Sequence, residues 1–436
     1  MLRPRLEPGS GRFRILSMKI LYVTAYLPQG VNEAFLIPEI RQLLNAGHEI
    51  LVIPRSCRGA LINGEELLGR TCREPLWSAQ VWKGAARTWA TAPSRTVDAV
   101  RTLGASRSLA VALKNAAVVP KALWLADVAR RWHAAHIHCH WAGTTATMAW
   151  LASELSGAPW SFTAHRWDIV ENNLFRHKAR SASFVRFISE DGLRMARALG
   201  VGPEANTVVL HMGVALPRKA AHARGAGGVV LCPARLTEVK GHRSLLEAWR
   251  MLKNRGVRGE LWLAGDGELG PELQVLTKRL GLSGSVKFLG TVPHEKLLAM
   301  YGEGAVDVVV LASLDLGQGN HEGIPVALVE AMSYGIPVVA AASGGTAELV
   351  VPGAGLLTPP GDASAIANAL QDMLSDGDLR TQLGDAGRRR AVEAHDVVRV
   401  VKDLEKAFEA ARPRSTLAAC GWPQAEVLPR NLSETR

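Results

Sequence analysis

Two glutamates and two cations have types and spacings that could bind a diphosphate flanked by hydroxyl-rich groups. Glu322 and Glu330 stand eight positions apart in the run G-N-H-E-G-I-P-V-A-L-V-E-A-M, and Arg235 and Lys240 stand five apart on an earlier loop. An arginine fork and a lysine ammonium can clamp a diphosphate together. Carboxylates repel phosphate but accept hydrogen bonds from hydroxyl groups, so the glutamates are expected on the two sides of the diphosphate. A ligand with this chemistry is a nucleotide sugar.

A strand, a glycine-rich loop and a helix must position the two glutamates. Residues 305–311 form a β-branched run short enough for a buried parallel strand, and residues 325–334 predict a helix with proline in its first turn. A second buried strand is predicted over residues 336–340. The loop opens at the helix N-terminus, where free N–H groups and the helix dipole favour an anion. Glu330 then lies roughly 7.5 Å along the helix from its start, away from the phosphates.

This stretch closely resembles the retaining glycosyltransferases of family 4, which have the GT-B fold and a Glu-x7-Glu signature, here Glu322 and Glu330. The surrounding E-G-I-P, E-A-M and G-G-T-A-E are most similar to members that build bacterial exopolysaccharides. The resemblance implies an α/β chain with two Rossmann-like, doubly wound domains facing a central cleft. It also implies transfer of a sugar, with retention, from a nucleotide-diphosphate sugar to a saccharide or polyprenyl-linked acceptor. No cofactor and no metal are expected, because cationic side chains take the place of magnesium.

The resemblance assigns roles to individual positions. Catalytic roles are expected for Glu322 and His165. The donor is expected to contact Arg235, Lys240, Glu330, Gly323, Ile324, Val326, Gly265 and Gly290. Acceptor or cleft loops are expected at Gly30, Asp168, Gly344 and Gly345. Many relatives have a Gly-Gly pair at the first of these loops, whereas this chain has only Gly30, and its wording N-E-A-F-L-I-P-E-I is similar to a subgroup whose loop serves the acceptor.

Several other interpretations stay open. A glutamate such as Glu330 is by itself compatible with the solvent face of an amphipathic helix. The glycines of the loop follow G-x-G-x-x-x-G rather than G-x-G-x-x-G, which argues against a Rossmann dinucleotide site. A GT-B sugar-nucleotide epimerase and a non-catalytic nucleotide-binding scaffold are the alternatives to a transferase.

Three histidines in the run H-I-H-C-H-W could share one face of a strand. His136, His138 and His140 alternate there, which is compatible with a metal site. Three ligands from one flat strand fit tetrahedral geometry poorly, and no carboxylate is near them in sequence. We therefore expect no metal at this strand.

Length and composition predict two domains. The 436 residues are 47% hydrophobic, which is enough for two cores. The expected boundaries are a disordered extension (1–17), an acceptor domain (18–216), a linker (217–228), a donor domain (229–395), a helix returning to the first domain (396–411) and a disordered tail (412–436). Five scattered cysteines without a C-x-x-C pair indicate a reducing cytoplasm rather than a disulfide framework.

A formal net charge of +11 indicates a polyanionic partner. Residues 73–135 hold ten basic and three acidic side chains together with Trp77, Trp82, Trp89, Trp124 and Trp132. This mixture is typical of a surface on anionic lipid head groups, such as the inner face of the plasma membrane. A solvated basic helix pair with its tryptophans in the core is the alternative. No nucleic-acid-binding module is visible, so no nucleic-acid partner is expected, and no uninterrupted apolar run predicts a spanning helix.

Overall fold

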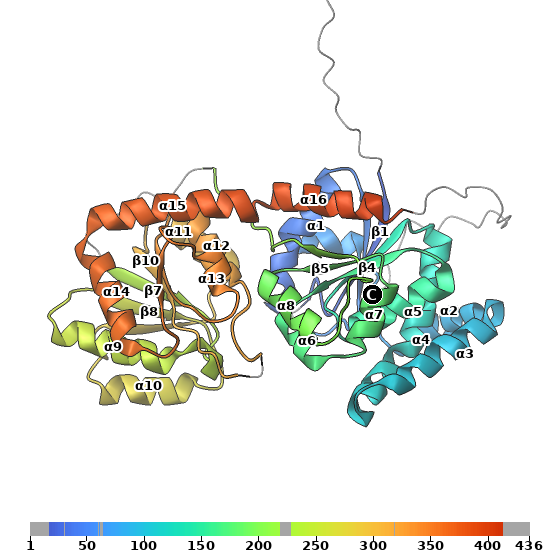
Figure 1. Cartoon of the computed structure of the whole chain (residues 1–436), viewed down its shortest axis with the longest axis horizontal. Coiled ribbons are helices and arrows are strands. Elements are labelled where there is room, and N and C mark those ends of the chain that lie inside the picture. Colours follow the sequence, from blue (N-terminus) through green and yellow to red (C-terminus); the bar gives the residue numbers. More distant parts are fainter. Residues whose placement is uncertain are drawn as a thin grey trace, which may run out of the picture.

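The computed structural model describes residues 17–29, 31–59, 61, 64–218, 228–317 and 319–412. They form two α/β domains that lie side by side (Figure 1). The predicted N-terminal extension and C-terminal tail fall almost wholly outside these ranges. Gly30 and most of the predicted linker also lie outside the described residues.

Six parallel strands build the sheet of the first domain, in the order β2-β1-β3-β4-β5-β6. Nearly every residue of its central strands is buried, because helices cover both faces of a parallel sheet. The chain reverses its winding direction between β1 and β3, and ligands of doubly wound sheets bind at such a point. The strands are β1 (Lys19–Thr24), β2 (Glu49–Pro54), β3 (His136–His140), β4 (Trp160–Ala164), β5 (Phe184–Phe187) and β6 (Thr207–Val209).

The helices of the first domain include an outlying group, α2 to α4, at the side away from the second domain (Figure 1). The helices and 3-10 turns are η1 (Val31–Leu36), α1 (Ile37–Asn45), η2 (Glu65–Arg70), α2 (Ala79–Thr91), α3 (Pro93–Arg101), η3 (Thr102–Ala105), α4 (Leu109–Trp132), α5 (Thr144–Ser156), α6 (Arg166–Glu171), α7 (Phe175–Ser181) and α8 (Glu190–Ala198).

Helix α4 is, among the described residues, the one helix long and apolar enough to cross a membrane by length and composition. Half of its most apolar window is buried inside the protein, and the helix packs against α2 and α5. Its Lys121 is fully buried and donates hydrogen bonds to the carbonyl oxygens of Pro54, Arg55 and Glu74. This packing explains the apolar composition of α4 without a membrane.

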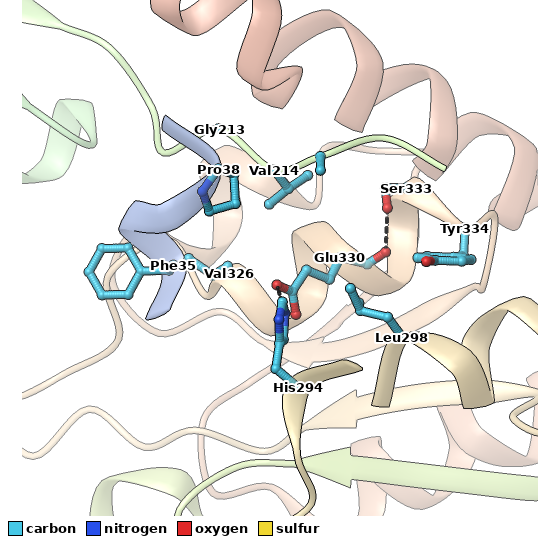
Figure 2. A pocket seen from close by; sticks show the side chains of 11 residues that line it. Phe35, Pro38, Gly213, Val214, His294, Leu298, Val326, Glu330, Ser333 and Tyr334 are labelled. Atoms are coloured by element: carbon cyan, nitrogen blue, oxygen red, sulfur yellow. Dashed lines mark hydrogen bonds and ion pairs between the residues drawn. The ribbon is translucent and has the colours of Figure 1, made fainter. Parts of the chain in front are cut away.

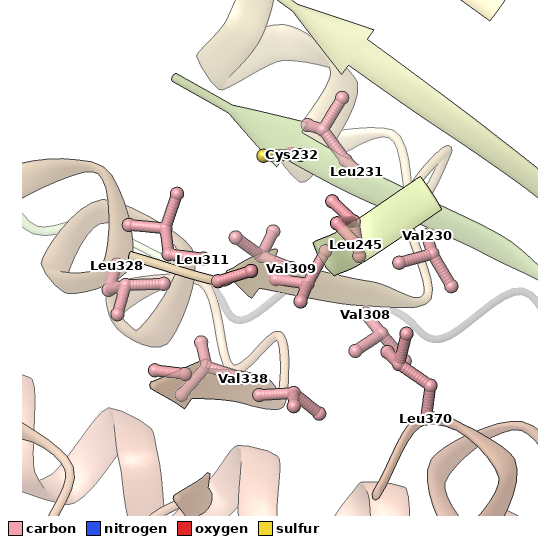
Figure 3. Close-up of a cluster of buried hydrophobic side chains, with 14 of the residues drawn as sticks. Val230, Leu231, Cys232, Leu245, Val308, Val309, Leu311, Leu328, Val338 and Leu370 are labelled. Carbon is pink, nitrogen blue, oxygen red and sulfur yellow. The ribbon is translucent and has the colours of Figure 1, made fainter. Parts of the chain in front are cut away.

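The second domain has a parallel sheet in the order β12-β11-β10-β7-β8-β9, with its winding reversed between β7 and β10. Figure 3 shows its core, in which valines of β7, β10 and β11 pack with leucines of the covering helices. The strands are β7 (Val229–Pro233), β8 (Glu260–Ala264), β9 (Val286–Gly290), β10 (Val308–Leu311), β11 (Val338–Ala341) and β12 (Leu356–Thr358). The helices are η4 (Glu238–Lys240), α9 (His242–Asn254), α10 (Gly270–Arg279), α11 (His294–Gly302), α12 (Val326–Ser333), α13 (Thr346–Leu349), α14 (Ala363–Ser375) and α15 (Gly377–His395).

The predicted β-loop-α-β unit is present, with small shifts at its ends. The strand expected over 305–311 begins only at Val308, and the helix expected from Pro325 begins one residue later, with Pro325 as its N-cap. Each shift is of the size that fraying and assignment produce at element ends.

Two consecutive helices join the domains. Helix α15 lies on the second domain, and α16 (Val397–Ala410) lies on the first, where it packs against α1 (Figure 1). Glu405 of α16 accepts a hydrogen bond from His48 at 2.8 Å, and both side chains are buried. At the crossing, the backbone of Val214 bonds to His395 and Val397. The last helix is thus part of the first domain's core.

Candidate active site

The loops that follow β7 and β10 meet at the switch point of the second sheet. Gly241 ends the first loop with φ +65°, and a Cβ there would overlap the carbonyl oxygen of Ala312. Only glycine permits this approach, which also lets Leu314 N donate to Val239 O at 2.8 Å. The close contact of the two loops brings their charged side chains together.

Lys240 and Glu322 form an ion pair at this meeting point. The Nζ of Lys240 lies 2.7 Å from each carboxylate oxygen of Glu322, and Ser313 Oγ donates to Glu322 Oε2 at 2.9 Å. The two ionic side chains are only 19% and 12% exposed. The sequence predicted that they contact different parts of a ligand, whereas the structure shows that they also contact each other. The carboxylate therefore holds the ammonium in place just before the N-terminus of α12.

Arg235 supplies a second cation on the same side of the domain. It is exposed, and its guanidinium has no hydrogen-bond or ion-pair partner within the described part of the chain. An exposed arginine fork on the loop that also carries Lys240 can bind an anionic group from solution.

Several of the predicted site glycines have a conformational or packing reason for being glycine. Of those predicted to contact the donor, a Cβ on Gly265 would overlap Ala234 O in the loop that carries Arg235, and Gly290 has φ +63° at the exposed end of β9. Of those predicted in cleft loops, a Cβ on Gly344 would overlap Glu322 O, and Gly345 N donates to Glu322 O at 3.3 Å. Their contacts with a donor or an acceptor stay a prediction.

The remaining predicted loop residues differ in what they can offer. Ile324 is buried in the core, so only its backbone could face a ligand. Gly323 has open space where a Cβ would stand, and its contact with a donor also stays a prediction.

Glu330 lines a cavity between the two domains (Figure 2). The cavity holds about 370 Å³ of empty space, its open mouth included. Its walls come from both domains and comprise Phe35, Pro38, Gly213, Val214, Ala215, His294, Leu298, Val326, Glu330, Ser333 and Tyr334. Glu330 Oε1 lies 2.7 Å from His294 Nε2, and this hydrogen bond raises the pKa of His294 above its usual value. Within the described ranges Oε2 of Glu330 has no hydrogen-bond donor, so it could accept from a ligand.

His165 stands across the cleft at the carboxyl end of β4. Its Nε2 lies 2.7 Å from Nε2 of His140, so one ring must donate and the other accept. Burial lowers the pKa of His165 to about 3, aided by the charge of Arg186. His165 is therefore neutral near pH 7, which suits a hydrogen bond to a hydroxyl group rather than an ion pair.

Asp168 does not open into the cleft. Its carboxylate is 7% exposed and accepts a hydrogen bond from the backbone N of His165 at 3.0 Å. Desolvation raises its pKa to about 7. We predicted Asp168 in a cleft loop. Its observed contact indicates an indirect role, in which the carboxylate fixes the backbone of His165.

Comparisons with known proteins agree with this geometry. Residues 218–390 match the family model described as Glycosyl transferases group 1. A GDP-mannose-dependent alpha-(1-6)-phosphatidylinositol monomannoside mannosyltransferase of Mycobacterium tuberculosis (strain CDC 1551 / Oshkosh) is 30% identical over 282 residues, or 59% of this chain and 72% of that relative. The chain belongs to the group 1 glycosyltransferases.

Other relatives match the glycosyltransferase over shorter stretches. The amylovoran biosynthesis glycosyltransferase AmsK of Erwinia amylovora is 40% identical over 142 residues, which are 32% of this chain and 34% of AmsK. The chain covers less than half the length of the first curated relatives that it matches. Anabaena Alr3699/HepE, solved in complex with UDP, superimposes with a TM-score of 0.68 at 21% identity, over 90% of this chain and 100% of that one. This likeness confirms the predicted fold class.

The two domains touch at the cleft. Arg166, next to His165 and not predicted as a site residue, donates a hydrogen bond to Gly319 O of the glycine-rich loop. A Cβ on Gly319 would crowd Val170 and Met195 of the first domain. Glu348 accepts hydrogen bonds from the first two backbone N–H groups of α8, at 2.8 and 2.7 Å. Contact between the domains therefore explains the glycine at position 319.

The histidines of β3 lie in a buried polar cluster. His136 and His138 both contact Ser161 Oγ, at 2.7 and 2.8 Å. The ligand atoms of Glu39, His138 and His140 lie within 4.8 Å of one another, so the fold supplies a carboxylate that is distant in sequence. The sequence argument considered only carboxylates near the histidines in the chain and so did not find this one.

Glu39 of this cluster already has strong partners. It accepts hydrogen bonds from Tyr22 Oη and from the fully buried guanidinium of Arg186, both at 2.6 Å. A dication would face the charge of Arg186, so the donor set fits a metal poorly. That the reaction needs no metal stays a prediction.

Proposed function

We propose that the chain transfers a sugar from a nucleotide-diphosphate sugar to a saccharide or lipid-linked saccharide in the synthesis of a bacterial surface polysaccharide. The observation that carries this proposal is the Lys240–Glu322 ion pair at the switch point of the second sheet, on a loop that also holds the exposed Arg235. Two cations on one loop and the N-terminus of α12 support the binding of a diphosphate here.

The departing diphosphate is the group that this cluster would stabilise. Negative charge grows on it as the bond to the sugar breaks, while positive charge grows on the sugar ring. Arg235, Lys240 and the N–H groups at the start of α12 act as fixed positive charge that stabilises the departing diphosphate, and this stabilisation requires no metal. The negative charge of the diphosphate itself helps to stabilise the positive charge on the sugar ring.

The sugar and the ribose would contact the carboxylates and the opposite histidine. Glu322, whose oxygens also hold Lys240, would accept hydrogen bonds from sugar hydroxyls, and neutral His165 would face the sugar from the first domain. The free Oε2 of Glu330 would accept from the ribose. None of the predicted cleft residues is committed as a nucleophile, so we propose retention without a covalent glycosyl-enzyme.

The relatives support the class of substrate. Alr3699/HepE binds UDP in its solved complex, and AmsK and the putative glycosyltransferase WcaL of Salmonella typhimurium are named for amylovoran and colanic acid biosynthesis. The two competing functions are an epimerase and a binding scaffold. The epimerase would form product without any acceptor, and the scaffold would bind nucleotide and transfer nothing.

A thermal-shift screen with UDP, GDP and ADP tests the donor site first. Binding to the folded state raises the melting temperature, so at least one nucleotide should stabilise the wild type and should stabilise Lys240→Ala less. Incubation with the matching nucleotide sugar should then release nucleotide faster when acceptor saccharides are added. Equal stabilisation of wild type and Lys240→Ala by every nucleotide would refute the proposed site.

We also propose that α2 and its flanking turns rest on an anionic membrane surface at the inner face of the plasma membrane. Trp77, Trp82 and Trp89 are 57%, 51% and 49% exposed, on the same segment as several lysines and arginines. Trp124 and Trp132 instead pack into the core. The packing of these two rings agrees with the solvated-helix alternative, whereas the three exposed rings support the lipid-facing interpretation.

A further inference from the structure

A half-buried aromatic shelf lies at the switch point of the first sheet, and the proposed donor chemistry uses only its histidine. Its members are Phe35, from the segment after β1, Trp141, directly after β3, and His165, after β4. The ring centroid of Trp141 lies 4.4 Å from that of His165 and 6.0 Å from that of Phe35. The shelf stands where a doubly wound sheet binds ligands.

A buried carboxylate anchors this shelf. Glu33 is 1% exposed, and it accepts hydrogen bonds from Trp141 Nε1 at 2.5 Å and from the backbone N–H groups of Ala25, Tyr26 and Leu27 at 2.9, 2.6 and 2.8 Å. No cation pairs with it among the residues that the structure describes. Burying a charge without a counter-ion costs free energy, so this arrangement is expensive for a loop that had only to connect two elements.

Trp141 also has a strained backbone. Its φ is +77°, in the left-handed region that large side chains rarely adopt. Strain of this kind is concentrated at binding and catalytic sites, where the surrounding structure imposes it. Here the Glu33 hydrogen bond and the His165 contact hold the indole in place.

The shelf faces the second domain. Phe35 lines the cavity that also contains Glu330 (Figure 2), and Arg166, next to His165, bonds to Gly319 of the second domain. The ring of Trp141 contacts both Phe35 and His165. A ligand on the shelf would therefore lie opposite the donor cluster, although no shelf residue belongs to the donor domain.

We propose that Phe35 and Trp141 form the wall of a subsite for the terminal sugar ring of the acceptor, and that Glu33 is a positioning residue that holds Trp141. This inference rests on the proposed transfer reaction. A pyranose has one apolar C–H face and a rim of hydroxyl groups. The rings of Phe35 and Trp141, set at 84° to each other, offer apolar contact, and the neutral imidazole of His165 beside them offers a hydrogen bond.

Saturation-transfer NMR on the full chain tests the subsite directly. The probes are the methyl glycosides of glucose, galactose and mannose at millimolar concentration, in the presence of the nucleotide that stabilises the protein most. Ring protons of at least one glycoside should receive saturation from the wild type. Trp141→Ala should bind it about tenfold more weakly, which is the scale of one lost aromatic contact.

Trp262→Ala is the matched control. Trp262 is also half-buried and also donates Nε1 to a glutamate, Glu260, at 2.8 Å, but it lies on β8 of the other domain. It should leave glycoside binding unchanged. Glu33→Gln should weaken glycoside binding while nucleotide stabilisation persists, a split that a merely structural role would not produce.

The failures of the two proposals are distinguishable. If no nucleotide stabilises the wild type, the donor site is wrong, whatever the glycosides do. If a nucleotide stabilises it but no glycoside receives saturation, or if Trp141→Ala binds glycoside as the wild type does, the subsite is refuted. If Trp141→Ala fails to fold, as shown by loss of its nucleotide shift, Phe35→Ala takes its place. Glycoside binding by Phe35→Ala equal to that of the wild type would then refute the subsite.

Discussion

Lys240 and Glu322 meet at 2.7 Å although 82 positions separate them in the chain. Each follows a strand next to the switch point of the second sheet, so the topology alone brings their loops together. The pair is preassembled, since the ammonium is held at 2.7 Å from both carboxylate oxygens in the protein alone. Fixed charge of this kind needs no reorganisation during a reaction, which makes it effective in stabilising a leaving group.

Lys240→Ala should lower kcat/KM for nucleotide-sugar turnover by about 100-fold or more, because it removes charge stabilisation of the departing diphosphate. The measurement is nucleotide release at varied donor concentration. Lys287→Ala is the control, since Lys287 also pairs with a glutamate at 2.7 Å but is exposed on β9. Unchanged turnover in Lys240→Ala would contradict the assignment.

The His294–Glu330 pair should make stability depend on pH. The hydrogen bond to Glu330 raises the pKa of His294 above 6.5, so the pair's contribution is full below 6.5 and is lost as pH rises through the raised pKa. Glu330→Gln should therefore lower the melting temperature more at a pH well below 6.5 than at an alkaline pH. Equal losses at both pH values would show that the pair does not titrate as described.

Gly241→Ala should destabilise the protein and abolish turnover, because a methyl group would push apart the loops that carry Lys240 and Ser313. Gly256 is the matched position, with φ +77° and open space around it. Gly256→Ala should cost only the strain of the left-handed conformation, about 1–2 kcal/mol. Urea titration measures both variants, and equal costs would mean that the contact at Ala312 is unimportant.

Replacing the three exposed tryptophans, Trp77, Trp82 and Trp89, by serine should reduce co-flotation with vesicles that contain anionic phosphatidylglycerol. Indole rings bind at the membrane interface, and the basic side chains add attraction to anionic head groups. Val275→Ser, at an exposed apolar position of α10, is the control. Wild-type flotation that is equal on neutral and anionic vesicles would remove the membrane proposal.

The sequence predicted the two-domain fold because buried parallel strands and their helices have strong local signals. It also identified Lys240, Glu322 and Glu330, since their spacing is part of a recognisable motif. The contacts between these residues depend on how loops from separate strands meet, and no local pattern records that. Glu33 and Glu39 were missed for the same reason, because each looks like an ordinary glutamate until the fold buries it.

The tryptophan segment shows a signal that was present but unused. Trp82 and Trp89 stand seven apart and share one face of α2, whereas Val81, Ala85 and Thr88 form the buried face. Helical periodicity alone could therefore have separated the outward rings from the inward ones. Trp124 of α4 is instead an inward ring. A Cβ on Gly84 of α2 would crowd this ring, so α4 packs closely against α2.

The crossing of α15 and α16 has a consequence for engineering chimeric transferases. A cut at the linker near Pro217 would separate the sheets but would leave α16, with its buried Glu405 and Phe408, attached to the wrong parent. A hybrid that borrows another donor half should therefore keep its own final helix and make a second junction near Asp396. The exchangeable cassette is an internal segment of the chain, not its C-terminal half.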